Sequence, residues 1–107
     1  MEIWGQGNRE QNFIHISDAC NFLLKSIQNF DSVQGEILLC TSDKEHSNNT
    51  LAHFIANYTM SRIAYVNEDN SVSLNYNNEL SCKLLNWEPK VNLESEIINY
   101  IEWKKQF

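Results

Sequence analysis

Apolar residues recur at helical spacing in three stretches of the chain, within residues 17–29, 47–58 and 92–105. Side chains three and four residues apart share one face of a helix, and Ser, Asp or Asn at the start of each stretch can cap the first turn. A shorter helix is predicted at residues 79–86, before Pro89. The apolar faces are predicted to be Cys20, Leu23, Leu24 and Ile27; Leu51, Phe54, Ile55 and Tyr58; and Leu93, Ile97, Tyr100, Ile101 and Trp103.

Four short segments have the pattern of β-strands. Residues 2–5 and 13–16 precede the first helix, and residues 63–66 follow the second. Residues 37–40 are continuously apolar, which is typical of a strand buried on both faces. The polar residues 67–78 are predicted to form a loop. The order β-β-α-β-α-β-α-α predicts a mixed α/β fold in a single domain over residues 1–107.

Composition narrows the function classes. The net charge is −6, with only two arginines, Arg9 and Arg62, which disfavours nucleic acid and acidic membrane surfaces as partners. No apolar run is long enough to cross a bilayer, and with no signal-peptide pattern we expect a cytoplasmic protein. The cysteines form no metal-binding pair and are expected to be reduced thiols, and the histidine spacing fits no metal site. These residues are Cys20, Cys40, Cys82, His15, His46 and His53.

The sequence lacks the motifs of dinucleotide binding and hydride transfer. There is no GxxGxxG turn between a strand and a helix and no Tyr-x-x-x-Lys pair. The turn Gly5-Gln6-Gly7 precedes a strand, so it does not match the dinucleotide fingerprint. We therefore predict no catalytic residue and no cofactor site in this chain.

Three stretches resemble one enzyme family. Residues 5–19 resemble the "GxGxxxRDFIHVDDA" segment of the extended short-chain dehydrogenase/reductases, which include NAD-dependent nucleotide-sugar epimerases and dehydratases. Residues 47–55 are similar to a helix of that family. Residues 82–94, with Trp103, are similar to its "KKLLGWxPKVSLEEG…W" ending. The resemblance covers nearly the whole chain in register.

The resemblance implies that the chain is the small C-terminal substrate-binding lobe of such an enzyme, lacking the Rossmann domain. It would bind a nucleoside-diphosphate sugar, while the missing Rossmann half would hold NAD or NADP and the catalytic residues. The chain alone would not be catalytic. The alternative is a stand-alone interaction or nucleotide-binding module that kept the fold and lost the chemistry, or a remnant with no ligand. The sugar, the base and the reaction stay open.

Four substrate-binding residues are implied by the resemblance. Trp4 stands where relatives place an aromatic or apolar residue against the base, and Asn48 where they often contact a phosphate at a helix N-terminus. Gln11 replaces the usual diphosphate-binding arginine, and Arg9 would supply the missing charge. Alternatively, Trp4 packs at a core edge, Arg9 is a solvated loop residue, and Ser47 or Asn48 only caps the helix.

Two departures from the family pattern concern ligand binding. The family's "YN-x-G" is replaced by residues 38–41, and its second arginine has no counterpart in residues 67–78. We also expect Trp4, Phe13 and Tyr65 to form an exposed apolar surface facing the missing half. Self-association through this surface is the corresponding prediction.

Overall fold

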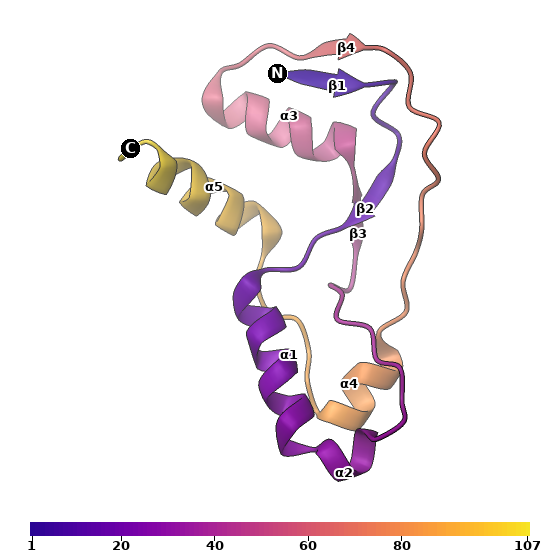
Figure 1. Ribbon diagram of the computed structural model, residues 1–107. Helices are drawn as coiled ribbons and strands as arrows, with labels where there is room; N and C mark the ends of the chain where they lie inside the picture. Colours follow the sequence, from indigo (N-terminus) through magenta and orange to yellow (C-terminus); the bar gives the residue numbers. More distant parts are fainter. The chain divides into compact units, whose positions relative to one another are not determined.

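The computed structural model describes residues 1–107 and confirms the mixed α/β fold class. The chain forms two compact units: unit 1 comprises Met1–Gln11, Glu45–Asn75 and Asn92–Phe107, and unit 2 comprises Asn12–Lys44 and Tyr76–Val91. The single domain predicted over residues 1–107 stays a prediction. The elements in chain order are β1 (Glu2–Trp4), β2 (Glu10–Asn12), α1 (Ile16–Gln28), α2 (Phe30–Val33), β3 (Glu45–Ser47), α3 (Asn48–Thr59), β4 (Ala64–Val66), α4 (Glu79–Leu85) and α5 (Leu93–Lys104) (Figure 1).

In unit 1, two short parallel strands lie beside a helix (Figure 1). β1 pairs with β4, and the N–H of Gly5 extends the pairing with a 2.9 Å hydrogen bond to the carbonyl oxygen of Val66. α3 contacts β1, and Ile3, Ala52 and Ala56 are each only 6% exposed. Alanine side chains allow a helix to approach a strand closely, so this small core fixes the turn that follows β1.

Side-chain caps set the starts of the two long helices of unit 1. The Thr50 N–H donates to Ser47 Oγ at 3.1 Å, and the Ser95 N–H donates to Asn92 Oδ1 at 3.0 Å. These are the caps predicted from the sequence. α3 ends at Thr59, and the C-cap residue Met60 adopts a left-handed conformation with φ of 58°. No helix of the chain is both long enough and apolar enough to cross a bilayer.

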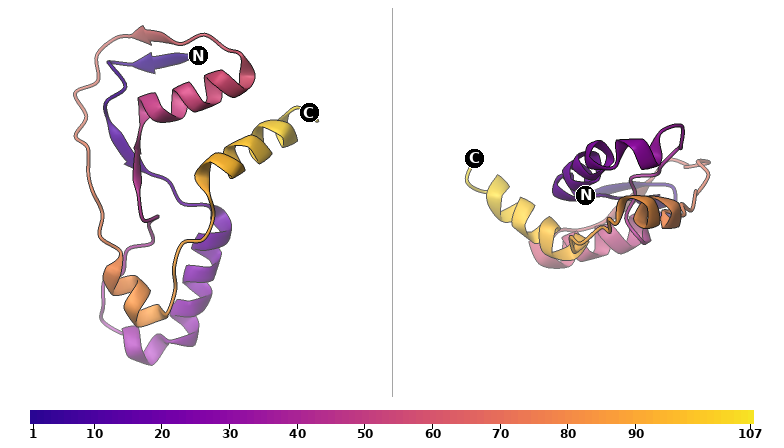
Figure 2. Two further views of the ribbon diagram at one scale, coloured as in Figure 1. Left: turned by 180° about the vertical axis from the view of Figure 1, so that it is seen from behind. Right: turned by 90° about the horizontal axis from the view of Figure 1, so that it is seen from below.

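Unit 2 has its own hydrophobic core. α1, α2 and α4 contact one another (Figure 2), and the core between them is formed by Phe22, Val33, Leu85 and Trp87. The rings of Phe22 and Trp87 meet edge to face with centroids 5.1 Å apart, a favourable aromatic geometry.

Asp18 connects α1 to the segment that follows α4. Its side chain is only 4% exposed, and its two oxygens accept the backbone N–H groups of Lys90 and Val91 at 3.1 and 3.0 Å. Its carbonyl oxygen accepts the indole N–H of Trp87 at 3.1 Å. A buried carboxylate requires such partners, so this acidic residue in the first turn of α1 also anchors a distant loop.

The strand predicted at residues 13–16 is wrong. β2 covers Glu10–Asn12 instead, and Ile16 already begins α1. His15 takes the capping role predicted for Ser17, because the Ser17 N–H donates to His15 Nδ1 at 3.1 Å. This earlier cap starts the helix before a strand can form.

The strand predicted at residues 37–40 is also absent, because a strand exists only where a second backbone pairs with it. By contrast, β3 (Glu45–Ser47) forms in a polar connection because β2 pairs with it. α2 was not predicted. The helix at α1 is confirmed, but its predicted apolar face is exposed, with Leu23 at 62% and Ile27 at 74%.

Candidate functional site

The turn after β1 depends on two glycines. Gly5 and Gly7 have φ angles of 67° and 74°, which side chains of L-amino acids rarely adopt. A Cβ atom on Gly7 would overlap the side chain of Asn49, and one on Gly5 would lie 2.9 Å from the backbone nitrogen of Asp69. The turn is therefore packed against the start of α3 and the loop after β4.

Asn49, in the first turn of α3, holds this glycine turn in place. Its Nδ2 donates to the carbonyl oxygen of Gln6 at 2.6 Å, and its backbone N–H donates to that of Gly7 at 2.9 Å. The hydroxyl of Tyr65 on β4 donates to Asn49 Oδ1 at 2.9 Å. One asparagine thus joins three segments that are far apart in the sequence.

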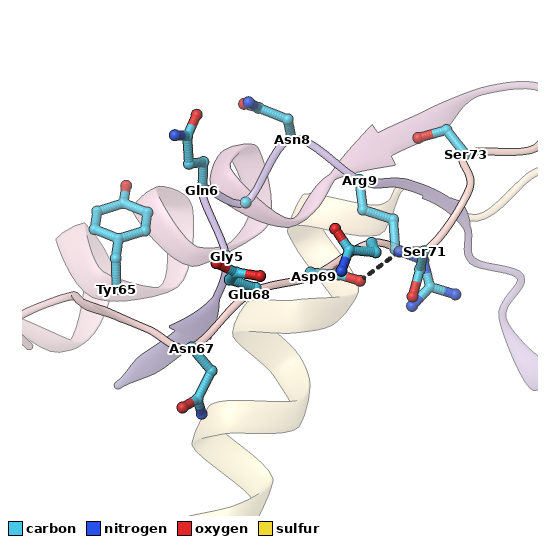
Figure 3. Close-up of a pocket in the computed structure, with 12 residues that line it drawn as sticks. Gly5, Gln6, Asn8, Arg9, Tyr65, Asn67, Glu68, Asp69, Ser71 and Ser73 are labelled. Atoms are coloured by element: carbon cyan, nitrogen blue, oxygen red, sulfur yellow. Dashed lines mark hydrogen bonds between the residues drawn. The ribbon is translucent and has the colours of Figure 1, made fainter.

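A polar pocket of about 480 Å³ lies between this turn and the loop after β4 (Figure 3). The volume falls within the range of about 300–1,000 Å³ that is common for small-molecule sites. The lining residues all belong to unit 1 and are Gly5, Gln6, Gly7, Asn8, Arg9, Tyr65, Asn67, Glu68, Asp69, Asn70, Ser71 and Ser73.

The charged groups of the pocket are one cation and two carboxylates, Arg9, Glu68 and Asp69. Hydrogen bonds from the hydroxyl and N–H of Ser71, together with the charge of Arg9, lower the pKa of the Asp69 carboxyl below its usual value. The Nε of Arg9 is buried without a hydrogen-bond partner. A buried N–H donor without an acceptor costs about 1–3 kcal/mol of stability.

The candidate residues from the sequence have different surroundings. Arg9 lines the pocket, whereas Trp4 is 61% exposed on β1 and is not among the lining residues. Gln11 and Asn48 contact each other, with Gln11 Nε2 donating to Asn48 Oδ1 at 2.8 Å. Their roles in substrate binding stay predictions. Sequence reasoning missed Asn49, although it is the neighbour of Asn48 in the capping sequence.

Unit 2 contains a second hollow, of about 690 Å³. Its charged lining residues are Lys25, Lys90, Asp43 and Glu88. The thiol of Cys82 also lines it, and burial, followed by the nearby Asp43 and Glu88 carboxylates, raises the pKa of that thiol. The opposite charges balance, so this hollow has no net charge to attract an anion.

The three cysteines are free thiols, as predicted. No group of three or more His, Cys, Asp or Glu side chains is placed to hold a metal ion. Trp4, Phe13 and Tyr65 are each exposed, at 61%, 38% and 51%, and the single apolar surface predicted for them stays a prediction. Self-association through that surface stays a prediction.

Several solved structures contain the same fold. Pal from Bacillus thuringiensis superposes with a TM-score of 0.87 and 27% sequence identity, over 99% of this chain and 34% of that protein. This chain shares its fold with a third of that protein. No protein-family model and no curated protein matches the sequence.

Two further similar structures are complexes with nucleotide sugars. MoeE5, solved with UDP-glucose and NAD, superposes with a TM-score of 0.84 and 23% identity, over 99% of this chain and 36% of that protein. UDP-glucuronic acid 4-epimerase from Bacillus cereus, solved with UDP-glucuronic acid and NAD, superposes with a TM-score of 0.85 and 15% identity. The match covers 98% of this chain and 35% of that protein. At this identity the likeness establishes the fold alone, and the chain spans about a third of each of these proteins.

Proposed function

We propose that this chain is the nucleoside-diphosphate-sugar-binding portion of an NAD(P)-dependent nucleotide-sugar epimerase or dehydratase, corresponding to the C-terminal part of such an enzyme. The observation that carries the proposal is the polar pocket built on the Gly5-Gln6-Gly7 turn, within the segment that resembles the family. The fold shared with proteins that bind UDP-sugars supports it.

The pocket has the chemistry to hold a nucleotide sugar. Arg9 is the one cation of the pocket lining and would pair with a phosphate oxygen. Asp69, whose lowered pKa keeps it ionised at neutral pH, and Glu68 can accept hydrogen bonds from sugar hydroxyls. The ring of Tyr65 adds an aromatic surface. These roles match a ligand with both hydroxyls and a phosphate.

The same charges predict weak binding by the chain alone. One cation and two carboxylates give the pocket lining a net charge of −1, whereas a diphosphate is itself negative. Gln11 stays uncharged where the family has an arginine. The remaining part of the enzyme would therefore supply further positive charge, together with the cofactor and the catalytic residues.

This chain has no residues that fit a dinucleotide. It lacks the GxxGxxG turn and the Tyr-x-x-x-Lys pair, and its own glycine turn connects β1 to β2, whereas the dinucleotide fingerprint connects a strand to a helix. The role proposed for the chain is therefore to bind and orient substrate.

Calorimetric titration of the full chain with UDP-glucose tests the proposal. We expect a dissociation constant in the range of tens of micromolar to millimolar, weakened at least about tenfold by Arg9→Ala, since a hydrogen bond to a charged group contributes about 1.5–3 kcal/mol. The matched control is Arg62→Ala, which removes the chain's other arginine, an exposed residue outside the pocket lining. No binding at a UDP-glucose concentration of about 10 mM would contradict the proposal. Equal effects of the two substitutions on the dissociation constant would also contradict it.

The stand-alone module remains the alternative and predicts a different result. A chain that had evolved to bind a nucleotide without a partner would reach sub-micromolar affinity, about −8 kcal/mol or stronger. Sub-micromolar binding that Arg9→Ala leaves unchanged would favour this alternative.

A further inference from the structure

The backbone N–H groups at the start of α3 already have acceptors within unit 1. The N–H of Asn48 donates to the carbonyl oxygen of Arg9 at 3.0 Å, and the N–H of Asn49 donates to that of Gly7 at 2.9 Å. The N–H of Thr50 donates to the serine cap at 3.1 Å. These donors carry the positive end of the helix dipole, and the protein itself uses all three. An anion in the pocket therefore needs other donors.

Two peptide groups of the glycine turn have N–H groups on the side away from α3. The carbonyl oxygen of Gln6 accepts the side-chain amide of Asn49 at 2.6 Å, and the carbonyl oxygen of Gly7 accepts its backbone N–H at 2.9 Å. The chain has no cis peptide bond, and in a trans peptide the C=O and N–H point in opposite directions. The N–H groups of Gly7 and Asn8 therefore point away from Asn49. Neither donates a hydrogen bond within the chain.

The next such peptide along the chain shows what lies on that side. The carbonyl oxygen of Arg9 faces α3, where it accepts the Asn48 N–H. The N–H of the same peptide, that of Glu10, donates to Ser73 Oγ at 2.9 Å. Ser73 belongs to the loop after β4 and lines the polar pocket (Figure 3). The side of the turn away from α3 is therefore the side of this pocket.

We infer that the N–H groups of Gly7 and Asn8 form an anion-binding nest that receives a phosphate group of the ligand. Successive N–H groups on one side of a turn form a concave site for an anion, and Gly7 has the left-handed φ of 74° that such a turn uses. Both peptides accept a hydrogen bond from Asn49 at their carbonyl oxygens, which strengthens their N–H groups as donors. The inference rests on the proposed function for the identity of the ligand, a nucleoside diphosphate.

Backbone donors suit the charges of this pocket. Arg9 is the one cation of its lining, opposed by the carboxylates of Glu68 and Asp69, and Gln11 is uncharged. A phosphate oxygen that accepts a backbone N–H makes a charge-assisted hydrogen bond, which is stronger than a bond between neutral groups. The nest thus supplies two such bonds where the side chains offer a single positive charge.

The first test is an NMR titration of the full chain with UDP-glucose, inorganic pyrophosphate and uridine. The amide protons of Gly7 and Asn8 are expected to move downfield with the first two ligands, because a proton donated to a phosphate oxygen is deshielded, and to stay unchanged with uridine. Binding of UDP-glucose without these downfield shifts would overturn the inference and leave the proposed function standing. Downfield shifts with pyrophosphate but no binding of UDP-glucose would support the nest and contradict the proposed function.

The second test removes one backbone donor at a time. Residues 1–19 are synthesised with an ester in place of one backbone N–H and ligated to the rest of the chain at Cys20. One ester replaces the N–H of Asn8. The matched control replaces that of Glu10, which differs in being bonded to Ser73, while the carbonyl oxygen before each ester accepts from the start of α3.

The two esters are expected to have opposite effects. The ester at Asn8 should weaken UDP-glucose binding at least about tenfold, because a strong hydrogen bond to a charged group is lost. The ester at Glu10 should lower the midpoint of thermal unfolding more and leave the dissociation constant nearly unchanged. Unchanged affinity with the ester at Asn8, or an equal loss of affinity with both esters, would overturn the inference.

Discussion

Replacing Asp18 with alanine should strongly destabilise unit 2. Asp18 is 4% exposed and accepts two backbone N–H groups, those of Lys90 and Val91, at 3.1 and 3.0 Å. These two bonds hold the segment after α4, which also contains the buried Trp87. Alanine would leave both donors without an acceptor and a small cavity at the start of α1.

The magnitude follows from the two charge-assisted hydrogen bonds. Each contributes about 1.5–3 kcal/mol, so their sum is about 3–6 kcal/mol. Water can reach the partly exposed segment and replace part of the lost hydrogen bonding, so we expect the free energy of unfolding to fall by about 3 kcal/mol. That is a large part of the total of about 5–15 kcal/mol that is typical of domains of this size. Asp18→Asn keeps one acceptor oxygen and should lose less.

Urea unfolding followed by circular dichroism measures the loss of stability. In a background in which the exposed Trp4 and Trp103 are replaced by Phe, the emission maximum of the buried Trp87 gives a local signal. Asp31→Ala is the control, because Asp31 is exposed in α2 and surface substitutions usually change stability by less than about 0.5 kcal/mol. A loss for Asp18→Ala no larger than that for Asp31→Ala would refute the reasoning that these hydrogen bonds stabilise the unit.

Further predictions concern the glycine turn, the thiols and catalysis. Gly7→Ala should destabilise unit 1 and abolish ligand binding, because the new Cβ atom would overlap Asn49. The control Gly35→Ala, where nothing lies within 4 Å of the new Cβ atom, should cost only the backbone strain of about 1–2 kcal/mol. Thermal unfolding measures the stability of both variants. Burial, with a smaller contribution from the Asp18 carboxylate, raises the pKa of the Cys40 thiol. Because less of the Cys40 thiol is then ionised at pH 8, mass spectrometry should show slower alkylation of Cys40 than of the exposed Cys20. The pure chain should neither reduce NAD(P) nor epimerise UDP-glucose, and turnover in a coupled assay would contradict its role as a binding portion.

The helices were predictable from the sequence because their signals are local. Periodic apolar residues and the caps Ser47 and Asn92 indicated α3 and α5 correctly. For α1 the same periodicity identified the helix but not the covered face, since Leu23 and Ile27 are exposed while Phe22 is buried. Periodicity shows which side chains share a face, and only the rest of the fold decides which face is covered.

Strands were less predictable because they depend on distant partners. Residues 37–40 have the composition of a buried strand but meet no second strand in this chain. β3 forms from polar residues because β2 lies opposite it. Composition alone therefore could not distinguish the two segments.

The candidate site also contains residues that the local sequence indicates and residues that only the fold brings together. Arg9 was found because it lies in a segment that resembles a family motif. Asn49 and Asp69 were missed because their positions depend on contacts with the glycine turn, which lies more than 40 residues away in the sequence. Glycines followed later by a capping Asn are too common a pattern to indicate such a contact by themselves.

The most direct test of the central claim is an NMR titration of the full chain with UDP-glucose, read residue by residue. The largest shifts are expected on the backbone amides of residues 5–9 and 67–71, which line the pocket of unit 1. The amides around Lys25 and Lys90, which line the second hollow in unit 2, are expected to change little. Shifts that cluster in unit 2, or no shifts at millimolar ligand, would contradict the proposal that this chain binds a nucleotide sugar through the glycine turn.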